Sequence, residues 1–180
     1  MNVGRPRRVD WGGRQVKSAI WKAPVPGRVR VTRLNLEGDK QSDLRVHGGA
    51  DKAVYFYPAE HYAWWRAELP ELDLPWGAFG ENLTTEGLLE ADVRVGDSFR
   101  AGSAEFRVTT PRMPCYKLMV RFDREDMVRR FLDSGRSGFY LAVLAEGEVG
   151  AGDSIELRSR DEGDVTVADV FARYQRRKGA

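Results

Sequence analysis

A chain of 180 residues is long enough for one well-filled hydrophobic core and holds two only with difficulty. Hydrophobic residues make up 42% and charged residues 31%, a balance that excludes the disordered and fibrous classes. The net charge of +2, from 29 basic and 27 acidic residues, gives no overall field that would draw the chain to nucleic acid or to a membrane surface.

The single cysteine excludes an internal disulfide framework and fits a reducing compartment. The first fifteen residues, MNVGRPRRVDWGGRQ, are polar throughout and do not resemble a signal peptide. Apolar runs are far shorter than the roughly 20 residues that a membrane helix needs. We therefore expect a cytoplasmic protein that binds neither nucleic acid nor a membrane.

Alternation of apolar and polar residues with period two predicts most of the secondary structure. RVRVTRLNL (residues 28–36) and SAEFRVT (103–109) are typical of half-buried strands. Gly, Pro and Asp bound most of the further candidates. These further strands are predicted over residues 53–57, 93–99, 139–144 and 154–159.

Three segments have helical spacing. Pro58 suits the first turn of a helix over residues 58–69. Asp123 is placed to cap a second helix that Gly135 ends, and Thr166 with Asp169 forms a loose capping box before a third.

Short strands without regular strand–helix alternation argue against a parallel, doubly wound sheet. We predict a mainly β fold, a closed or partly closed β-barrel with a few peripheral α-helices. Long loops are expected at residues 70–92 and 111–117, where functional sites tend to lie on such a scaffold.

The only cysteine, Cys115, lies in TTPRMPCYKL, where Pro111 and Pro114 predict a rigid, irregular loop. In an extended backbone Lys117 shares the face of Cys115 and Arg112 points the opposite way, so that only a turn near Pro114 brings both cations to the sulfur. Either cation would favour the thiolate form. From these ten residues alone a buried packing role is the favoured interpretation, because free cysteine is among the most buried residue types.

A lone cysteine narrows the possible chemistry. Zinc and iron–sulfur sites need about four protein ligands, and the chain offers one Cys with only His47 and His61 beside it. Cys115 can still act as a nucleophile, or as one ligand to a metal that arrives with its other ligands.

Three further segments contain candidate ligand-binding residues. His47 precedes two glycines, where backbone can approach a ligand closely, although an exposed histidine in a tight hairpin is the favoured interpretation of this motif by itself. Asn82 in GENL offers an amide to a heterocycle or a phosphate, or else forms an Asx turn. Near the first long strand, a group of polar and cationic side chains is suited to a phosphate unless it is simply solvated. This group consists of Lys17, Ser18, Lys22 and Arg28.

In order, the blocks GRQVKSAIWKAPVPGRVRVTRLNLEGDKQSDLRVHGGADKAVYFYPAEHYAWW, GAFGENLTTEGLLEADVRVGDSFRAG, TTPRMPCYKL and SGRSGFYLAVLAEGEVGAGDSIEL resemble the MOSC domain. This module is named after the C-terminal domain of molybdenum cofactor sulfurase, and the similarity is to its stand-alone bacterial form. The resemblance implies a strand-rich barrel over residues 1–160. It also implies that residues 161–180 form a C-terminal helical extension, where several relatives continue into a three-helix domain. Ala142 stands near the place where bacterial relatives commonly carry an arginine.

The resemblance implies a molybdenum-pterin cofactor whose pterin supplies two sulfur ligands and for which Cys115 is the protein ligand to molybdenum. The implied activity is reduction of N-hydroxylated small molecules, such as the base hydroxylaminopurine, with electrons from a separate reductase. His47 and Asn82 would line the pocket. The residues that would hold the pterin phosphate are Lys17, Ser18, Arg28, Arg112 and Lys117.

Two alternatives remain open at this point. The barrel could carry sulfur as a Cys115 persulfide or deliver the cofactor to other enzymes without catalysis. It could also be a ligand-binding barrel in which Cys115 is buried and inert.

Overall fold

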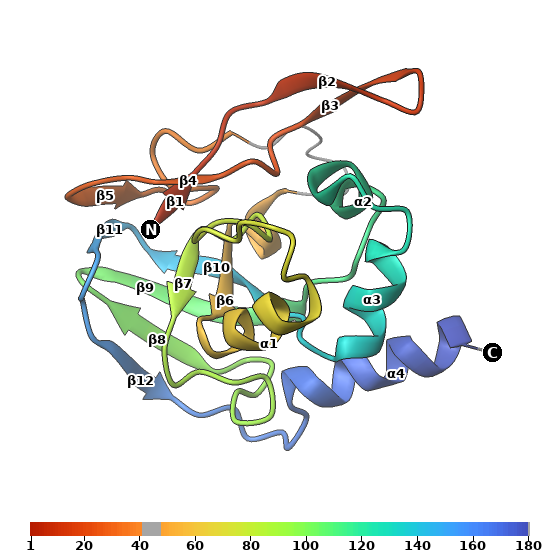
Figure 1. The fold of residues 1–180 in the computed structure, drawn as a ribbon. Coiled ribbons are helices and arrows are strands. Elements are labelled where there is room, and N and C mark those ends of the chain that lie inside the picture. Colours follow the sequence, from red (N-terminus) through yellow and green to blue (C-terminus); the bar gives the residue numbers. More distant parts are fainter. Residues whose placement is uncertain (41–47, 180) are drawn as a thin grey trace.

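The computed structural model describes residues 1–40 and 48–179. Its main element is a six-stranded sheet with the strand order β12-β8-β9-β10-β6-β7, curled into a half-barrel (Figure 1). Neighbouring strands are antiparallel except β6 and β7, which are parallel. The strands of this sheet are β6 (Val54–Pro58), β7 (Leu83–Thr85), β8 (Ser98–Ala101), β9 (Ala104–Pro111), β10 (Phe139–Ala145) and β12 (Ile155–Ser159).

Three two-stranded antiparallel pairs complete the β structure. They are β1 with β4, β2 with β3, and β5 with β11. Figure 1 shows β2 and β3 as a hairpin at the top of the view, set apart from the main sheet. The strands are β1 (Asn2–Val3), β2 (Arg7–Trp11), β3 (Arg14–Ser18), β4 (Ala23–Pro24), β5 (Arg28–Val31) and β11 (Gly147–Gly150).

The predicted mainly β, partly closed barrel with peripheral helices is confirmed. The helical elements are η1 (Ala50–Lys52, a 3-10 turn), α1 (Glu60–Glu68), α2 (Lys117–Phe122), α3 (Met127–Ser134) and α4 (Val167–Gly179). No helix within the described ranges is both long and apolar enough to cross a membrane.

Strand β6 separates two hydrophobic cores because it is buried on both faces. Its alternating side chains divide between them: Val54 and Phe56 enter the core of the half-barrel, whereas Tyr55 and Tyr57 enter a second core shared with the helices. In the second core the Trp65 indole donates a hydrogen bond of 2.7 Å to the Tyr57 hydroxyl. The tyrosines of β6 thus form part of the core on the side of the sheet that the helices cover.

Two predicted strands are shorter than the alternation indicates. The strand that begins at Arg28 ends at Val31, because the Thr32 hydroxyl bonds the Asn35 carbonyl at 2.9 Å and turns the chain. The strand predicted over residues 93–99 begins only at Ser98, because Asp97 accepts the Arg94 amide at 2.9 Å in a turn. In both cases a local side-chain bond to the backbone competes with the strand.

The prediction that Asp123 caps the second helix is wrong. Asp123 instead ends α2, with a left-handed φ of 51°, and α3 begins four residues later at Met127. Helix α2, which the sequence did not predict, begins at Lys117, where the predicted loop ends. Gly135 ends α3 with φ 70°, as predicted.

The predicted capping box of the last helix is confirmed. The Thr166 amide donates to Asp169 at 3.0 Å, and the Asp169 amide donates to the Thr166 hydroxyl at 3.1 Å. Val167 and Phe171 of α4 are buried in the half-barrel core and the helical core respectively. Helix α4 therefore packs onto the barrel, and the division of the chain at residue 160 stays a prediction.

Candidate functional site

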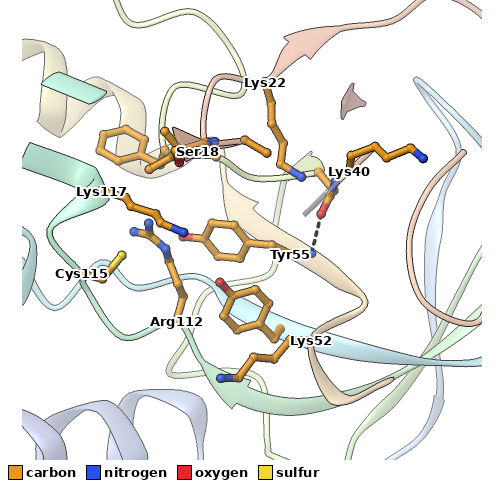
Figure 2. A pocket seen from close by; sticks show the side chains of 14 residues that line it. Ser18, Lys22, Lys40, Lys52, Tyr55, Arg112, Cys115 and Lys117 are labelled. Atoms are coloured by element: carbon orange, nitrogen blue, oxygen red, sulfur yellow. Dashed lines mark hydrogen bonds between the residues drawn. The ribbon is translucent and has the colours of Figure 1, made fainter. Parts of the chain in front are cut away.

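A pocket with a cavity volume of about 80 Å³ lies on the helical side of β6, where β9 leaves the sheet for α2. Figure 2 shows Arg112, Cys115 and Lys117 on one side of it and Lys22 on the other. Five cationic side chains line this cation pocket, and its described lining contains no Asp or Glu. The lining is Ser18, Ala19, Ile20, Lys22, Lys40, Lys52, Tyr55, Phe79, Gly80, Asn82, Arg112, Cys115, Lys117 and Tyr140.

Cys115 is a half-buried free thiol in the irregular segment between β9 and α2. Its carbonyl accepts the Leu118 amide at 2.9 Å, which turns the chain into α2. At the other end of the segment the Arg112 amide donates to the Gly138 carbonyl at 3.3 Å. This turn places Arg112, Cys115 and Lys117 in one pocket, whereas an extended backbone would have separated Arg112 from the other two.

The Arg112 side chain is buried, with 5% of its surface exposed. Its guanidinium lies 5.5 Å from the centroid of the Tyr55 ring and 5.0 Å from that of Phe131. No acceptor in the described part of the chain bonds its Nη1 atom. A buried donor without a partner costs about 1–3 kcal/mol, and more when it is charged. Arg112 is therefore a preorganised donor for an anion or an acceptor that enters the pocket.

Two tyrosines form an uncharged wall of the pocket. Tyr55 and Tyr140 are cross-strand partners on β6 and β10, with ring centroids 5.1 Å apart. Burial raises the pKa of both phenols, so both stay protonated at neutral pH. The Tyr55 hydroxyl donates to the Ser137 carbonyl at 2.7 Å, and the Lys52 ammonium lies 6.0 Å from the centroid of the Tyr140 ring.

A buried ion pair forms the opposite wall. The Lys22 ammonium lies 2.5 Å from Asp39, and the side chains are 9% and 0% exposed. Asp39 also accepts the Gly4 amide at 2.8 Å and the Asn82 side-chain amide at 2.9 Å. Burial lowers the pKa of Lys22, and the attraction of Asp39 offsets part of that effect.

Asn82 has an internal role. Its side-chain oxygen accepts the Tyr55 amide at 3.1 Å, while its Nδ2 atom donates to Asp39 and, at 3.4 Å, to the Asn2 carbonyl. Both the oxygen and the nitrogen of the Asn82 amide are therefore engaged in hydrogen bonds within the protein. Asn82 lines the pocket and positions Tyr55 and Asp39, whose partner is Lys22.

The N-terminal candidates separate. Ser18 is buried, lines the pocket and accepts the Ile20 amide at 3.2 Å. Lys17 is exposed on the β2–β3 hairpin opposite Arg8, because neighbouring residues of a strand face opposite sides. Arg28 is also outside the pocket, where it forms a 3.0 Å ion pair with Asp153. Neither Lys17 nor Arg28 lines the pocket, and their contact with a cofactor phosphate stays a prediction.

The two histidines have different outcomes. His47 lies outside the described residues. His61 packs edge-on against Tyr57, with ring centroids 5.4 Å apart, and its Nε2 atom is 2.8 Å from Glu90. The expectation that His61 serves packing is confirmed.

Sequence reasoning missed four polar residues of the lining, which are Lys40, Lys52, Tyr55 and Tyr140. The tyrosines belong to predicted strands, but only their pairing across β6 and β10 brings them together. Lys52 ends η1, two residues before β6 begins at Val54, and its place just ahead of a predicted strand is the sequence signal that could have found it. Lys40 is exposed, and Figure 2 shows its side chain extending away from Arg112 and Cys115.

Comparisons with known proteins agree with one another. A family model described as MOSC domain matches residues 43–156. Protein YiiM of Escherichia coli is 46% identical over 159 residues, which cover 86% of this chain and 70% of YiiM. A protein of Gibberella moniliformis named Reductase is 37% identical over 173 residues, which cover 94% of this chain but 30% of that protein. The crystal structure of YiiM from Geobacillus stearothermophilus has a TM-score of 0.80 at 35% identity, covering 99% of this chain and 83% of the other.

Proposed function

The chain belongs to the MOSC domain family, and on that premise we propose that it is a molybdenum-cofactor oxidoreductase that reduces N-hydroxylated compounds. One observation carries the proposal. The cation pocket gathers the only thiol of the chain with five cationic side chains, one of which, Arg112, is buried with an unpartnered N–H group. This donor set suits an anionic cofactor whose metal is already held by sulfur.

The residues of the pocket fit the implied cofactor. Arg112 and Lys22 provide buried positive charge for the pterin phosphate, with Lys117 and the Ser18 hydroxyl on the same lining. A guanidinium suits phosphate because its N–H groups form a fixed fork. Cys115 supplies one thiolate, the soft ligand type that molybdenum held by sulfur accepts. When bound, the cofactor would supply the metal that exchanges electrons with the substrate.

The protein's own groups then have distinct tasks. Reduction of an N–OH group to N–H releases water and consumes two electrons and two protons for each substrate molecule. The Tyr140 hydroxyl holds a proton at the pocket wall and is the donor to the substrate, whereas Lys22 is committed to Asp39 and to the phosphate. The aromatic faces of Tyr55 and Phe79 exclude water on the inner side.

Electrons must come from another protein. The chain has one cysteine, and its sequence carries no signature of a flavin or iron–sulfur site. The name of the Gibberella moniliformis relative, Reductase, supports an oxidoreductase assignment. We therefore propose a separate reductase as the electron donor.

Turnover tests this proposal directly. Protein from a host that synthesises the cofactor is assayed with hydroxylaminopurine and chemically reduced methyl viologen, which replaces the reductase. We expect wild type and Arg28→Gln to form the aminopurine product and Cys115→Ser to form none above background. Equal rates in wild type and Cys115→Ser would refute the metal-ligand role.

A second function, sulfur carriage, is favoured by the half-exposed thiol of Cys115. Its prediction is distinct. Freshly purified protein would contain a persulfide, detected by mass spectrometry as an increment of about 32 Da that a thiol reductant removes. An increment that persists after reduction, or none at all, excludes the carrier.

A further inference from the structure

A second cavity, of about 230 Å³, lies beside β7, where residues of the half-barrel core form part of its lining. Apolar side chains of Leu83, Ala101, Val149 and Ile155 form part of its wall. Its volume exceeds the roughly 30 Å³ that one water occupies in the liquid. There is therefore room for a small organic molecule.

Two buried oxygen atoms at this cavity have no hydrogen-bond partner in the described ranges. They are Oδ1 of Asn2 and Oγ1 of Thr85, in side chains whose residues are 0% and 3% exposed. Both residues line the cavity. Buried polar atoms are almost always satisfied, and each exception requires an explanation.

The orientation of the Asn2 amide is fixed by its neighbours. The Thr84 hydroxyl donates to Glu81 at 3.0 Å, so it is left to accept from the Asn2 Nδ2 atom at 3.3 Å. A flipped amide would give up this bond. Oδ1 is consequently the free atom of Asn2, and it is an acceptor.

The charged groups at the cavity favour a ligand of the same kind, one that carries positive charge. The described lining includes two carboxylates, Glu86 and Asp153. Asp153 is paired with Arg28 at 3.0 Å, so Glu86 is the lining carboxylate that supplies negative charge. The indole of Trp76, 42% exposed, is on the same lining, with the Arg66 guanidinium 5.4 Å from its ring centroid.

We propose that this acceptor cavity (Asn2, Trp76, Thr85, Glu86 and the chain from Val149 to Ile155) is a second ligand site, for a small aromatic molecule that carries a cationic amino group. The N–H donors of the ligand bond Asn2 Oδ1 and Thr85 Oγ1, while its ring contacts the apolar wall and Trp76. The site uses no residue of the cation pocket and does not rest on the molybdenum function.

The test uses three probes of one size, namely benzylammonium, benzyl alcohol and benzoate. Binding is followed by amide and indole resonances of ¹⁵N-labelled full-length protein. We expect benzylammonium to bind most tightly and to shift resonances of Trp76, Thr85 and Gly150, and benzoate to bind least. Equal affinity for the three probes, or shifts confined to Arg112 and Cys115, would overturn the proposal.

Two variants separate a ligand site from a site for structural water. Thr85→Val removes one unpartnered hydroxyl while keeping the shape of the side chain, so we expect about tenfold weaker benzylammonium binding with an unchanged or higher melting temperature. A lower melting temperature with no binding in wild type identifies a water site and refutes the proposal.

Glu86→Gln, at an exposed position, keeps the test valid if Thr85→Val does not fold. It should weaken benzylammonium binding several-fold and leave benzyl alcohol unaffected. An equal loss for both probes would contradict the role of charge. Cys115→Ser is the control that should bind all three probes as wild type does.

Discussion

The cation pocket and the acceptor cavity lie against different cores of one small fold, and their linings are opposite in hydrogen-bonding character. The pocket contains Arg112, whose buried Nη1 atom has no partner in the described residues, together with four lysines. The cavity contains the Asn2 Oδ1 acceptor and the Thr85 hydroxyl, which have no partner in the described residues either, with Glu86 on the same lining. The unsatisfied N–H group of Arg112 favours an anion in the pocket, whereas the unsatisfied Asn2 acceptor beside Glu86 favours a cationic N–H donor in the cavity.

The two hollows are also held differently. The cation pocket rests on the buried Lys22–Asp39 pair, which Asn82 and Gly4 support. The ion pair at the acceptor cavity, between Arg28 and Asp153, is more exposed, with side chains that are 47% and 21% accessible. Buried pairs are costly to break from one side, whereas exposed pairs contribute little.

The largest effect on stability is expected from Asp39→Asn. This change leaves the Lys22 ammonium buried without its counter-charge, and we expect a loss of about 3–5 kcal/mol in the free energy of unfolding near neutral pH. The matched variant Asp153→Asn should cost much less in urea denaturation. Similar losses in both variants would remove the distinction between the two hollows.

The sign of the pH dependence sharpens this prediction. Without Asp39, the pKa of Lys22 falls further in the folded state, so the unfolded chain binds more protons between the folded and unfolded pKa values. Stability then rises with pH across that window, and the deficit of Asp39→Asn should shrink in alkaline solution. A deficit that grows above neutral pH would contradict the assignment.

Arg112→Met should abolish most anion binding with little change in stability. We expect pyrophosphate to bind the variant roughly tenfold to a hundredfold more weakly, since a hydrogen bond to a charged group contributes about 1.5–3 kcal/mol. The variant without ligand should lose little stability, because removal of a buried charge with one unpartnered N–H group offsets the loss of its contacts with Tyr55, Phe131 and Tyr140. Isothermal titration measures the affinity, with Arg28→Gln as the control that binds normally.

Pyrophosphate binding should weaken as pH rises towards alkaline values. The pKa of Lys22 is lowered by burial, so this ammonium loses its charge at a lower pH than an exposed lysine does. We expect a loss of roughly tenfold, which Lys22→Arg should remove because arginine keeps its charge. An identical pH profile in the two proteins would show that Lys22 does not contact the anion.

The smallest effect is expected at the acceptor cavity. Thr85→Val should leave stability unchanged or raise it by up to about 1 kcal/mol in the absence of ligand. The same variant should bind pyrophosphate as wild type does, because Thr85 does not line the cation pocket. Reduced pyrophosphate affinity would show that the two hollows are coupled.

Much of the fold could be predicted from local patterns. The apolar run of residues 139–144 and the capping box of Thr166 and Asp169 act within a few residues, so they are visible in sequence. The wrong predictions also have local causes, because a side chain or a turn competes with the expected element. Asp123 ends one helix and does not begin the next, and Asp97 closes a turn inside an apparent strand.

The candidate site was less predictable because long-range pairing builds it. Cys115, Arg112 and Lys117 share one segment, and the sequence could associate them through a turn. The wall formed by Tyr55 and Tyr140 depends on the register between two strands, which pairs residues 85 positions apart in sequence. The alternation of side chains along β3 already indicates that Lys17 faces solvent, since its neighbour Ser18 occupies the inward position.

The content of molybdenum and pterin in purified protein tests most directly whether the cation pocket holds the cofactor through Cys115. Wild type, Cys115→Ser and Arg28→Gln are produced in a host that synthesises the cofactor and compared by elemental analysis and pterin fluorescence. We predict molybdenum and pterin together in wild type and Arg28→Gln, and a loss of most molybdenum in Cys115→Ser. Molybdenum at background in wild type, or the same molybdenum in wild type and Cys115→Ser, would contradict the account.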